Sequence, residues 1–105
     1  MSVGFGMQVR MTAKPGSGER LGDLLLQAAE ALREDPRCLL YVVSRVKGEP
    51  DVILITEAWS DREAHDASLR SEAARALIAQ AMPLIDGSEA VEIEPAGKPL
   101  ERSAR

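Results

Sequence analysis

Two closely spaced segments, residues 38–46 and 52–59, are apolar for much of their length and rich in Val, Ile and Leu, which is typical of β-strands. The residues between them, 47–51, read Lys-Gly-Glu-Pro-Asp and have the composition of a turn, so the two strands are expected to pair as an antiparallel hairpin. A small sheet with one face in water would carry polar side chains at alternate positions. The sequence therefore predicts a sheet covered on both faces, on one by helices of the same chain and on the other by a second copy of it.

A further strand and a helix are predicted before the hairpin. Residues 3–13 alternate apolar side chains with small or polar ones, which is the period of a half-buried strand. Leucines at helical spacing then run from Leu21 to Leu32. Ser17 is the expected N-cap of this helix, and Asp35-Pro36 is expected to end it.

Helical signals return after the hairpin. Ser60 and Glu63 have the spacing of a capping box, which predicts a short helix over residues 61–69. Ser71 is expected to cap another helix, and Asp86-Gly87 is expected to stop it. Residues 90–94 alternate again and are expected to form a short last strand.

The order strand, helix, strand, strand, helix pair, strand predicts the α+β class. The simplest packing is a four-stranded antiparallel sheet with all helices on one face. The length of 105 residues suits one domain. We expect this domain to span residues 1–95, and residues 96–105, which hold few apolar side chains, to form a flexible C-terminal tail.

The composition argues against several classes of protein. The net charge of −4 and the presence of only three aromatic residues, Phe5, Tyr41 and Trp59, argue against binding of nucleic acid. No apolar run approaches the ~20 residues of a membrane helix and no signal-peptide pattern is present, so a cytoplasmic protein is expected. The single cysteine, Cys38, and the single histidine, His65, cannot form an internal disulfide or a structural zinc site. No glycine motif for phosphate or dinucleotide binding occurs, and we expect neither metal nor cofactor.

Aromatic and charged side chains of the hairpin are candidates for a ligand site. Trp59 is either a core aromatic or the wall of a pocket for a flat aromatic ligand, with its indole N–H as an oriented donor. Tyr41 and Arg45 share one face of the strand over residues 38–46. Either Tyr41 packs in the core while Arg45 is solvated or paired with Glu57, or the two side chains bind a phenolic oxygen. Glu57 itself is expected to be ion-paired at a rim or subunit contact.

The predicted short helix carries His65. This residue is either partly exposed or a general base, because the ordinary imidazole pKa suits proton transfer near neutral pH. Its neighbour Asp66 is expected to face a different direction, so a Ser–His–Asp triad is not expected. Cys38 is expected to be a small buried apolar residue rather than a reactive thiolate.

Three segments resemble the antibiotic biosynthesis monooxygenase family, which includes quinol and anthrone oxygenases. They are Lys14-Pro-Gly, the stretch from Asp35 to Tyr41, and Glu57-Ala-Trp-Ser-Asp-Arg-Glu-Ala. The last segment is the most specific, because the family commonly shows Glu, any residue, Trp, and then a polar stretch ending in Glu-Ala at the start of a helix. The resemblance covers residues 3–95. It implies a ferredoxin-like βαββαβ fold whose sheets pair into a dimeric α/β barrel.

The resemblance also implies a function. The expected activity is that of a cofactor-independent monooxygenase that oxidises a small phenolic, quinol or anthrone-like substrate with dioxygen, in a homodimer. The excess of Arg over Lys separately favours a bacterial origin. Trp59, His65 and Tyr41 are the candidate catalytic residues, and Arg45, Trp59 and Ser68 the candidate substrate-binding residues. Ser68 stands where many relatives have a histidine, nine residues after the tryptophan.

The helix over residues 70–84 lacks the histidine that haem-degrading relatives need, so haem degradation is not expected. Two polar groups that would support an oxygenase are also missing, because Ser68 stands where many relatives have a histidine and Ile55 where some anthrone-oxidising relatives have an asparagine. A non-oxidative biosynthetic enzyme, such as a cyclase, isomerase or dehydratase, is therefore one alternative. A non-catalytic ligand-binding dimer on the same scaffold is the other.

Overall fold

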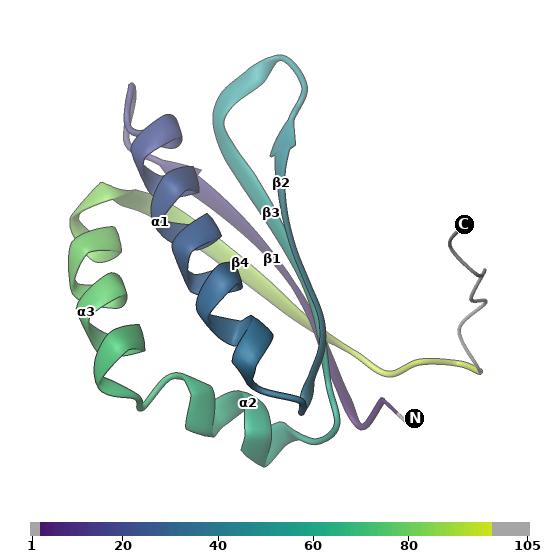
Figure 1. The fold of residues 1–105 in the computed structure, drawn as a ribbon. Coiled ribbons are helices and arrows are strands. Elements are labelled where there is room, and N and C mark those ends of the chain that lie inside the picture. Colours follow the sequence, from purple (N-terminus) through teal and green to yellow (C-terminus); the bar gives the residue numbers. More distant parts are fainter. Residues whose placement is uncertain (1–2, 98–105) are drawn as a thin grey trace, which may run out of the picture.

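The computed structural model describes residues 3–97, which form a four-stranded antiparallel sheet with helices on one face (Figure 1). The elements in chain order are β1 (Phe5–Ala13), α1 (Gly18–Ala31), η1 (Leu32–Glu34), β2 (Cys38–Val46), β3 (Glu49–Trp59), α2 (Arg62–Ser68), α3 (Glu72–Ala81), η2 (Met82–Leu84) and β4 (Ile85–Ile93). This order confirms the predicted ferredoxin-like α+β fold. Of the predicted tail over residues 96–105, only residues 96 and 97 belong to the described part of the chain.

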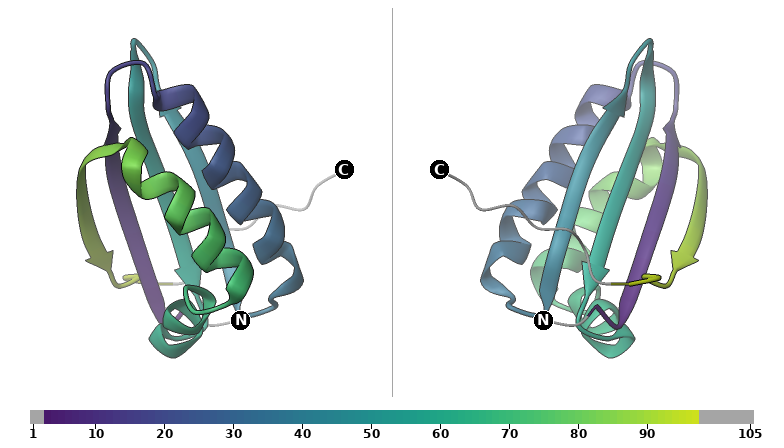
Figure 2. Two further views of the ribbon diagram at one scale, coloured as in Figure 1. Left: turned by 90° about the vertical axis from the view of Figure 1, so that its left-hand side faces the viewer. Right: turned by 90° about the vertical axis from the view of Figure 1, so that its right-hand side faces the viewer.

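The strand order in the sheet is β2-β3-β1-β4, so the hairpin forms one side of the sheet and the two terminal strands the other. Helices α1 and α3 lie side by side over one face, and α2 lies at one end of the sheet (Figures 1 and 2). Odd-numbered residues of β1 and β3 point toward the helices, as shown by the burial of Val9, Ile53 and Ile55. These side chains pack against Leu21 and Leu24 of α1 and form the main core.

The other face of the sheet is open and partly apolar. Within residues 3–97 no helix covers it (Figure 2). The strand register aligns Leu40 with Ala58, Gly6 and Ile93 in one row across the sheet, and Val42 with Thr56, Gln8 and Val91 in the next row. Four of these side chains are between 41% and 59% exposed: Leu40, Val42, Val91 and Ile93. The outer face of the sheet, defined by these two rows, therefore has the character of an interface.

The last strand differs from its prediction. Asp86-Gly87 does not stop a helix, and β4 begins at Ile85 rather than near residue 90. Pro83 in η2 has already ended the helical segment, and the chain then pairs with β1, where Gly87 lies opposite Thr12. Ladder hydrogen bonds along all of β1 outweigh the local turn preference of the Asp-Gly pair.

The hairpin turn is also shorter than predicted. Val46 pairs with Glu49, so only Lys47 and Gly48 lie between the strands. Gly48 has a φ of 80°, a left-handed conformation that glycine adopts without a steric penalty. This tight turn adds residues 49–51 to β3.

The N-terminus of α1 is capped by a residue from β3 instead of by Ser17. Ser17 occupies the N-cap position but makes no capping hydrogen bond with its side chain. The Asp51 carboxylate accepts the backbone N–H of Gly16 at 3.1 Å and that of Gly18 at 2.9 Å. A β-carbon on Gly18 would lie 2.0 Å from the Pro50 carbonyl oxygen, which explains the glycine at this close approach.

Replacing Asp51 by alanine is expected to lower the free energy of unfolding by about 0.5–2 kcal/mol, because the first N–H of α1, from Gly18, and the N–H of Gly16 in the preceding turn lose their acceptor. Ser17→Ala is the matched control and is expected to change the free energy by less than about 0.5 kcal/mol. Denaturant titration measures both values. A larger loss in Ser17→Ala than in Asp51→Ala would contradict this assignment of the cap.

The two later helices are capped by their own side chains. The cap of α2 is Asp61, which accepts the Ala64 N–H at 2.7 Å, so the predicted capping residue Ser60 is wrong by one position. Ser71 accepts the Ala74 N–H at 3.1 Å, as predicted.

Candidate functional site

A cavity of about 910 Å³ lies between the sheet and the helices. Its volume is in the range of pockets that hold small organic ligands. Most of its wall is apolar and comes from β1, β3, α1 and α3. Apolar side chains of this wall include Met7, Val9, Leu24, Leu25, Ile55 and Leu77.

The polar part of the cavity wall contains most of the predicted site residues. Tyr41 of β2, Trp59 of β3, and His65 and Ser68 of α2 all line the cavity, together with Glu57 of β3. Residues of the β2–β3 hairpin and of α2 thus lie next to each other in one wall of the cavity. The sequence interpretation did not place Glu57 inside the cavity.

Arg45 lies elsewhere. Its guanidinium packs against Gly22 of α1 and lies 3.7 Å from an Asp23 carboxylate oxygen, and both charged side chains are about half exposed, at 47% and 55%. Arg45 is not among the residues that line the cavity. Of the expected alternatives, the half-exposed Arg45 fits the solvated one: its ion-pair partner is Asp23 rather than Glu57, and it does not join Tyr41 at the cavity wall.

Glu57 and Trp59 form a buried hydrogen-bonded pair. The alternation of β3 directs both toward the helices, where Glu57 is 6% exposed and Trp59 is fully buried. The indole N–H of Trp59 donates to Glu57 Oε1 at 2.8 Å. Trp59 thus combines the two interpretations, core aromatic and cavity wall, but its N–H is already bound to Glu57 and does not point freely at a ligand.

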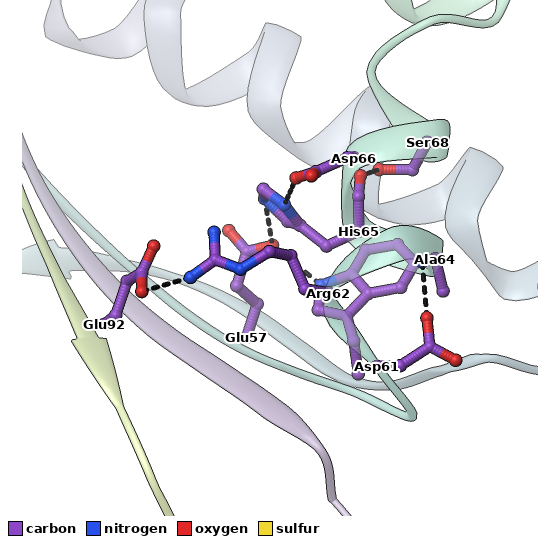
Figure 3. A network of polar contacts seen from close by, with 9 residues as sticks. Glu57, Asp61, Arg62, Ala64, His65, Asp66, Ser68 and Glu92 are labelled. Carbon is purple, nitrogen blue, oxygen red and sulfur yellow. Dashed lines mark hydrogen bonds and ion pairs between the residues drawn. The ribbon is translucent and has the colours of Figure 1, made fainter.

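His65 is buried rather than partly exposed, with 8% of its surface accessible. Its Nε2 lies 3.6 Å from Glu57 Oε1, and its Nδ1 lies 2.9 Å from Asp66 Oδ1 (Figure 3). The expectation that Asp66 faces away is wrong: consecutive helical residues point in different directions at Cβ, but the carboxylate bends back far enough to reach the ring nitrogen. The imidazole therefore has a carboxylate at each of its two nitrogens.

The His65 ring is held in place by aromatic neighbours. The Phe5 ring centroid lies 4.9 Å away, and Trp59 meets the imidazole edge-on at 5.8 Å. Arg62 lies over the Phe5 ring at 4.7 Å. It also forms an ion pair with Glu92 of β4, which Figure 3 shows. These contacts tie α2 to β1 and β4, which fixes the orientation of His65.

Ser68 is also engaged within α2. Its hydroxyl donates to the His65 carbonyl oxygen at 2.6 Å, one turn earlier in the helix. The hydroxyl oxygen can still accept a hydrogen bond from a ligand.

Tyr41 and Cys38 both keep their protons more strongly than usual. Burial raises the pKa of Tyr41 far above its ordinary value of 10.0, and the nearby Glu57 carboxylate adds to the increase. Burial also raises the pKa of the Cys38 thiol, again with a contribution from Glu57. Tyr41 is therefore a neutral hydrogen-bonding group rather than a base, and Cys38 is not a reactive thiolate.

The ionisation of Tyr41 can be observed directly, because it is the only tyrosine in the chain. Since folding raises its pKa, the folded protein is fully stabilised below the unfolded value of about 10 and loses stability as the pH rises above it. We expect the tyrosinate absorbance to appear at higher pH in folded than in denatured protein. Tyr41→Phe should abolish the signal and flatten the alkaline decline in stability. Coincident titrations of folded and denatured protein would contradict the burial of this phenol.

Glu57 and Asp66 are the residues that sequence interpretation missed at this site. A carboxylate on an apolar strand face is seldom buried without partners, so Glu57 on the face of Trp59 was a usable signal. Asp66 carried no such signal, because its contact with His65 depends on side-chain conformation.

The comparisons with known proteins agree with this architecture. The sequence profile of the antibiotic biosynthesis monooxygenase family matches residues 4–80. A crystal structure of a proposed antibiotic biosynthesis monooxygenase from Chloroflexus aurantiacus J-10-fl has 36% identity and a TM-score of 0.81, over 90% of this chain and 95% of that one. The chain belongs to the antibiotic biosynthesis monooxygenase family. No curated protein matches it significantly.

More distant structures share the fold. A proposed family member from Deinococcus radiodurans has 26% identity and a TM-score of 0.77, over 95% of this chain and 99% of that one. Another from Bacteroides thetaiotaomicron VPI-5482 has 17% identity and a TM-score of 0.86, over 94% of this chain and 95% of that one. The fold is thus retained where most residues differ.

Within residues 3–97, no helix is both long and apolar enough to cross a membrane. In the same range, no group of three or more His, Cys, Asp or Glu side chains is arranged to hold a metal ion.

Proposed function

We propose that this protein is a cofactor-independent monooxygenase that oxidises a small, electron-rich phenolic, quinol or anthrone-like ring with dioxygen. One observation carries the proposal: a large apolar cavity has a buried imidazole and a buried carboxylate side by side in its wall. An apolar wall favours a flat ring, and a base beside it can remove a proton from that ring. Family membership supports the oxidative reaction.

The proposed reaction balances without a further reactant. For an anthrone, removal of a proton from the ring CH₂ group gives an electron-rich carbanion, which passes an electron to dioxygen and then combines with the reduced oxygen as a peroxide. The peroxide takes the proton back, and loss of water leaves a carbonyl. The carbon supplies the electrons, one oxygen atom enters the product, and the other leaves as water.

Each part of the cavity wall would have its own role in this reaction. His65 would remove the proton at Nε2 and return it to the peroxide. Tyr41, as a neutral phenol, would donate a hydrogen bond to the oxygen of the substrate anion. The apolar wall would exclude bulk water and so protect the anion from reprotonation.

The direct test is oxygen consumption by protein treated with a chelator, with anthrone or hydroquinone as substrate. We expect uptake above the buffer rate and, for anthrone, one molecule of oxygen consumed for each quinone formed. No uptake with either substrate would overturn the proposal.

A non-oxidative enzyme is the second candidate. Ser68 replaces the histidine of many relatives and Ile55 replaces the asparagine of some, so two polar groups linked with oxidation are missing. A base in an apolar cavity could also drive isomerisation, cyclisation or dehydration. This candidate would be favoured if the protein exchanged the anthrone CH₂ protons with deuterated water but consumed no oxygen.

We infer in addition that the protein forms a homodimer through the outer face of the sheet. The exposed side chains Leu40, Val42, Val91 and Ile93 would be covered by the same face of a second copy. Family relatives are expected to pair their sheets in this manner. Burial of these rows would remove apolar surface from water and stabilise the strands that carry Tyr41 and Glu57.

A further inference from the structure

His65 lies between two carboxylates that differ in exposure and in their other partners. Glu57 reaches the ring from β3 and is buried, with its side chain 8% exposed. Asp66 reaches the ring from α2 (Figure 3), and its side chain is 46% exposed. The imidazole therefore connects a carboxylate at the cavity wall with one at the protein surface.

The two carboxylates compete unequally for the ring proton of a neutral imidazole. Asp66 Oδ1 is at hydrogen-bond distance from Nδ1, 2.9 Å, whereas Glu57 Oε1 is 3.6 Å from Nε2, which is too long for a hydrogen bond. Glu57 Oε1 also accepts the Trp59 N–H already. The proton of a neutral ring is stabilised best where it has a close acceptor, and that is on Nδ1.

We propose that Asp66 is a positioning residue that holds the ring proton of His65 on Nδ1 and thereby leaves Nε2 as the basic nitrogen beside Glu57. The use of Nε2 as a catalytic base rests on the proposed function, whereas the tautomer does not. When Nε2 takes up a substrate proton, each N–H of the imidazolium faces a carboxylate. The same Nε2 proton then passes to the peroxide, which restores the starting tautomer.

Packing keeps this arrangement from reversing by rotation of the ring. Phe5 and Trp59 contact the imidazole from β1 and β3. A ring turned by 180° would bring carbon atoms opposite the two carboxylates. The Asp66 contact therefore selects one nitrogen for the cavity side.

The ¹⁵N spectrum of histidine-labelled protein tests the tautomer, because His65 is the only histidine. In the pH range where one ring proton remains, we expect the chemical shift of a protonated nitrogen at Nδ1 and of an unprotonated nitrogen at Nε2. Free histidine prefers the opposite tautomer, so this result would be specific to the site. A wild-type spectrum with the proton on Nε2 would overturn the proposal.

Variants of Asp66 test the cause. Asp66→Ala is expected to shift the tautomer ratio toward the Nε2 form by about tenfold or more, because a hydrogen bond to a charged acceptor is lost. Asp66→Asn should largely retain the Nδ1 proton, since its amide oxygen can accept it. Glu63→Ala, which removes an exposed carboxylate from the same helix, should leave the ratio unchanged. Retention of the Nδ1 form in Asp66→Ala would contradict the role of Asp66.

Kinetics test the consequence for catalysis. Asp66→Ala should lower kcat for anthrone oxidation about tenfold or more and change KM by less than about twofold, since the cavity is untouched. If the tautomer shifts in Asp66→Ala but kcat is unchanged, Asp66 has no role in catalysis. Wild-type protein with the expected tautomer but no oxygen consumption would refute the proposed function and leave the tautomer assignment standing.

Discussion

Replacing His65 by glutamine is expected to lower kcat for anthrone-dependent oxygen consumption about 10²–10⁴-fold. Glutamine approximates the size and hydrogen-bonding reach of the imidazole but cannot accept a proton near neutral pH. Glu57 remains nearby, but its Oε1 already accepts the Trp59 N–H. The loss should therefore appear in kcat rather than in KM.

The matched control is Arg33→Gln, which changes an exposed residue on η1 that pairs only with Glu30 among its described contacts. Its kcat should equal that of wild type. Circular dichroism and thermal unfolding must show that His65→Gln is folded. Wild-type kcat in a folded His65→Gln protein would contradict the assignment of His65 as the base.

Replacing Val42 by arginine is expected to prevent formation of the proposed dimer. Val42 is 41% exposed in the isolated chain and lies on the outer face of the sheet, halfway along the edge strand β2 and opposite Thr56. In a dimer paired through this face, the substitution would bury a charge in an apolar contact on both subunits, at a cost of several kcal/mol for each charge. Sedimentation at micromolar concentration should show the mass of two chains for wild type and of one for the variant.

Leu26→Arg is the control for this experiment. Leu26 has a similar exposure, 48%, but belongs to α1 on the opposite side of the sheet. This variant should remain a dimer. A monomeric wild type, or a Val42→Arg protein that sediments with the wild-type mass, would contradict pairing through the outer face.

The element order could be predicted because the strong local signals agreed with the tertiary structure. The apolar segments at residues 38–46 and 52–59 do form the hairpin, and Ser71 does cap α3. The prediction failed where distant pairing determined the outcome. The side chain that caps α1 is Asp51 rather than Ser17, and Gly87 lies in β4 because this segment pairs with β1.

Part of the candidate site could also be predicted, namely the residues that local sequence signals identify. The alternation of β3 and the resemblance to the family both pointed to Trp59, and the residue type pointed to His65. Their partners depended on side-chain geometry that spacing does not encode. The Asp66 carboxylate bends back along α2 to reach the His65 ring. Arg45 is on the same face of β2 as Tyr41, but its guanidinium packs against Gly22 and pairs with Asp23 of α1.

The origin of the product oxygen tests the monooxygenase proposal most directly. Chelator-treated protein is supplied with anthrone and ¹⁸O₂ in unlabelled water, and the quinone is analysed by mass spectrometry. The account predicts one labelled oxygen atom in each newly formed quinone. Unlabelled product, or no product above the uncatalysed level, would contradict it.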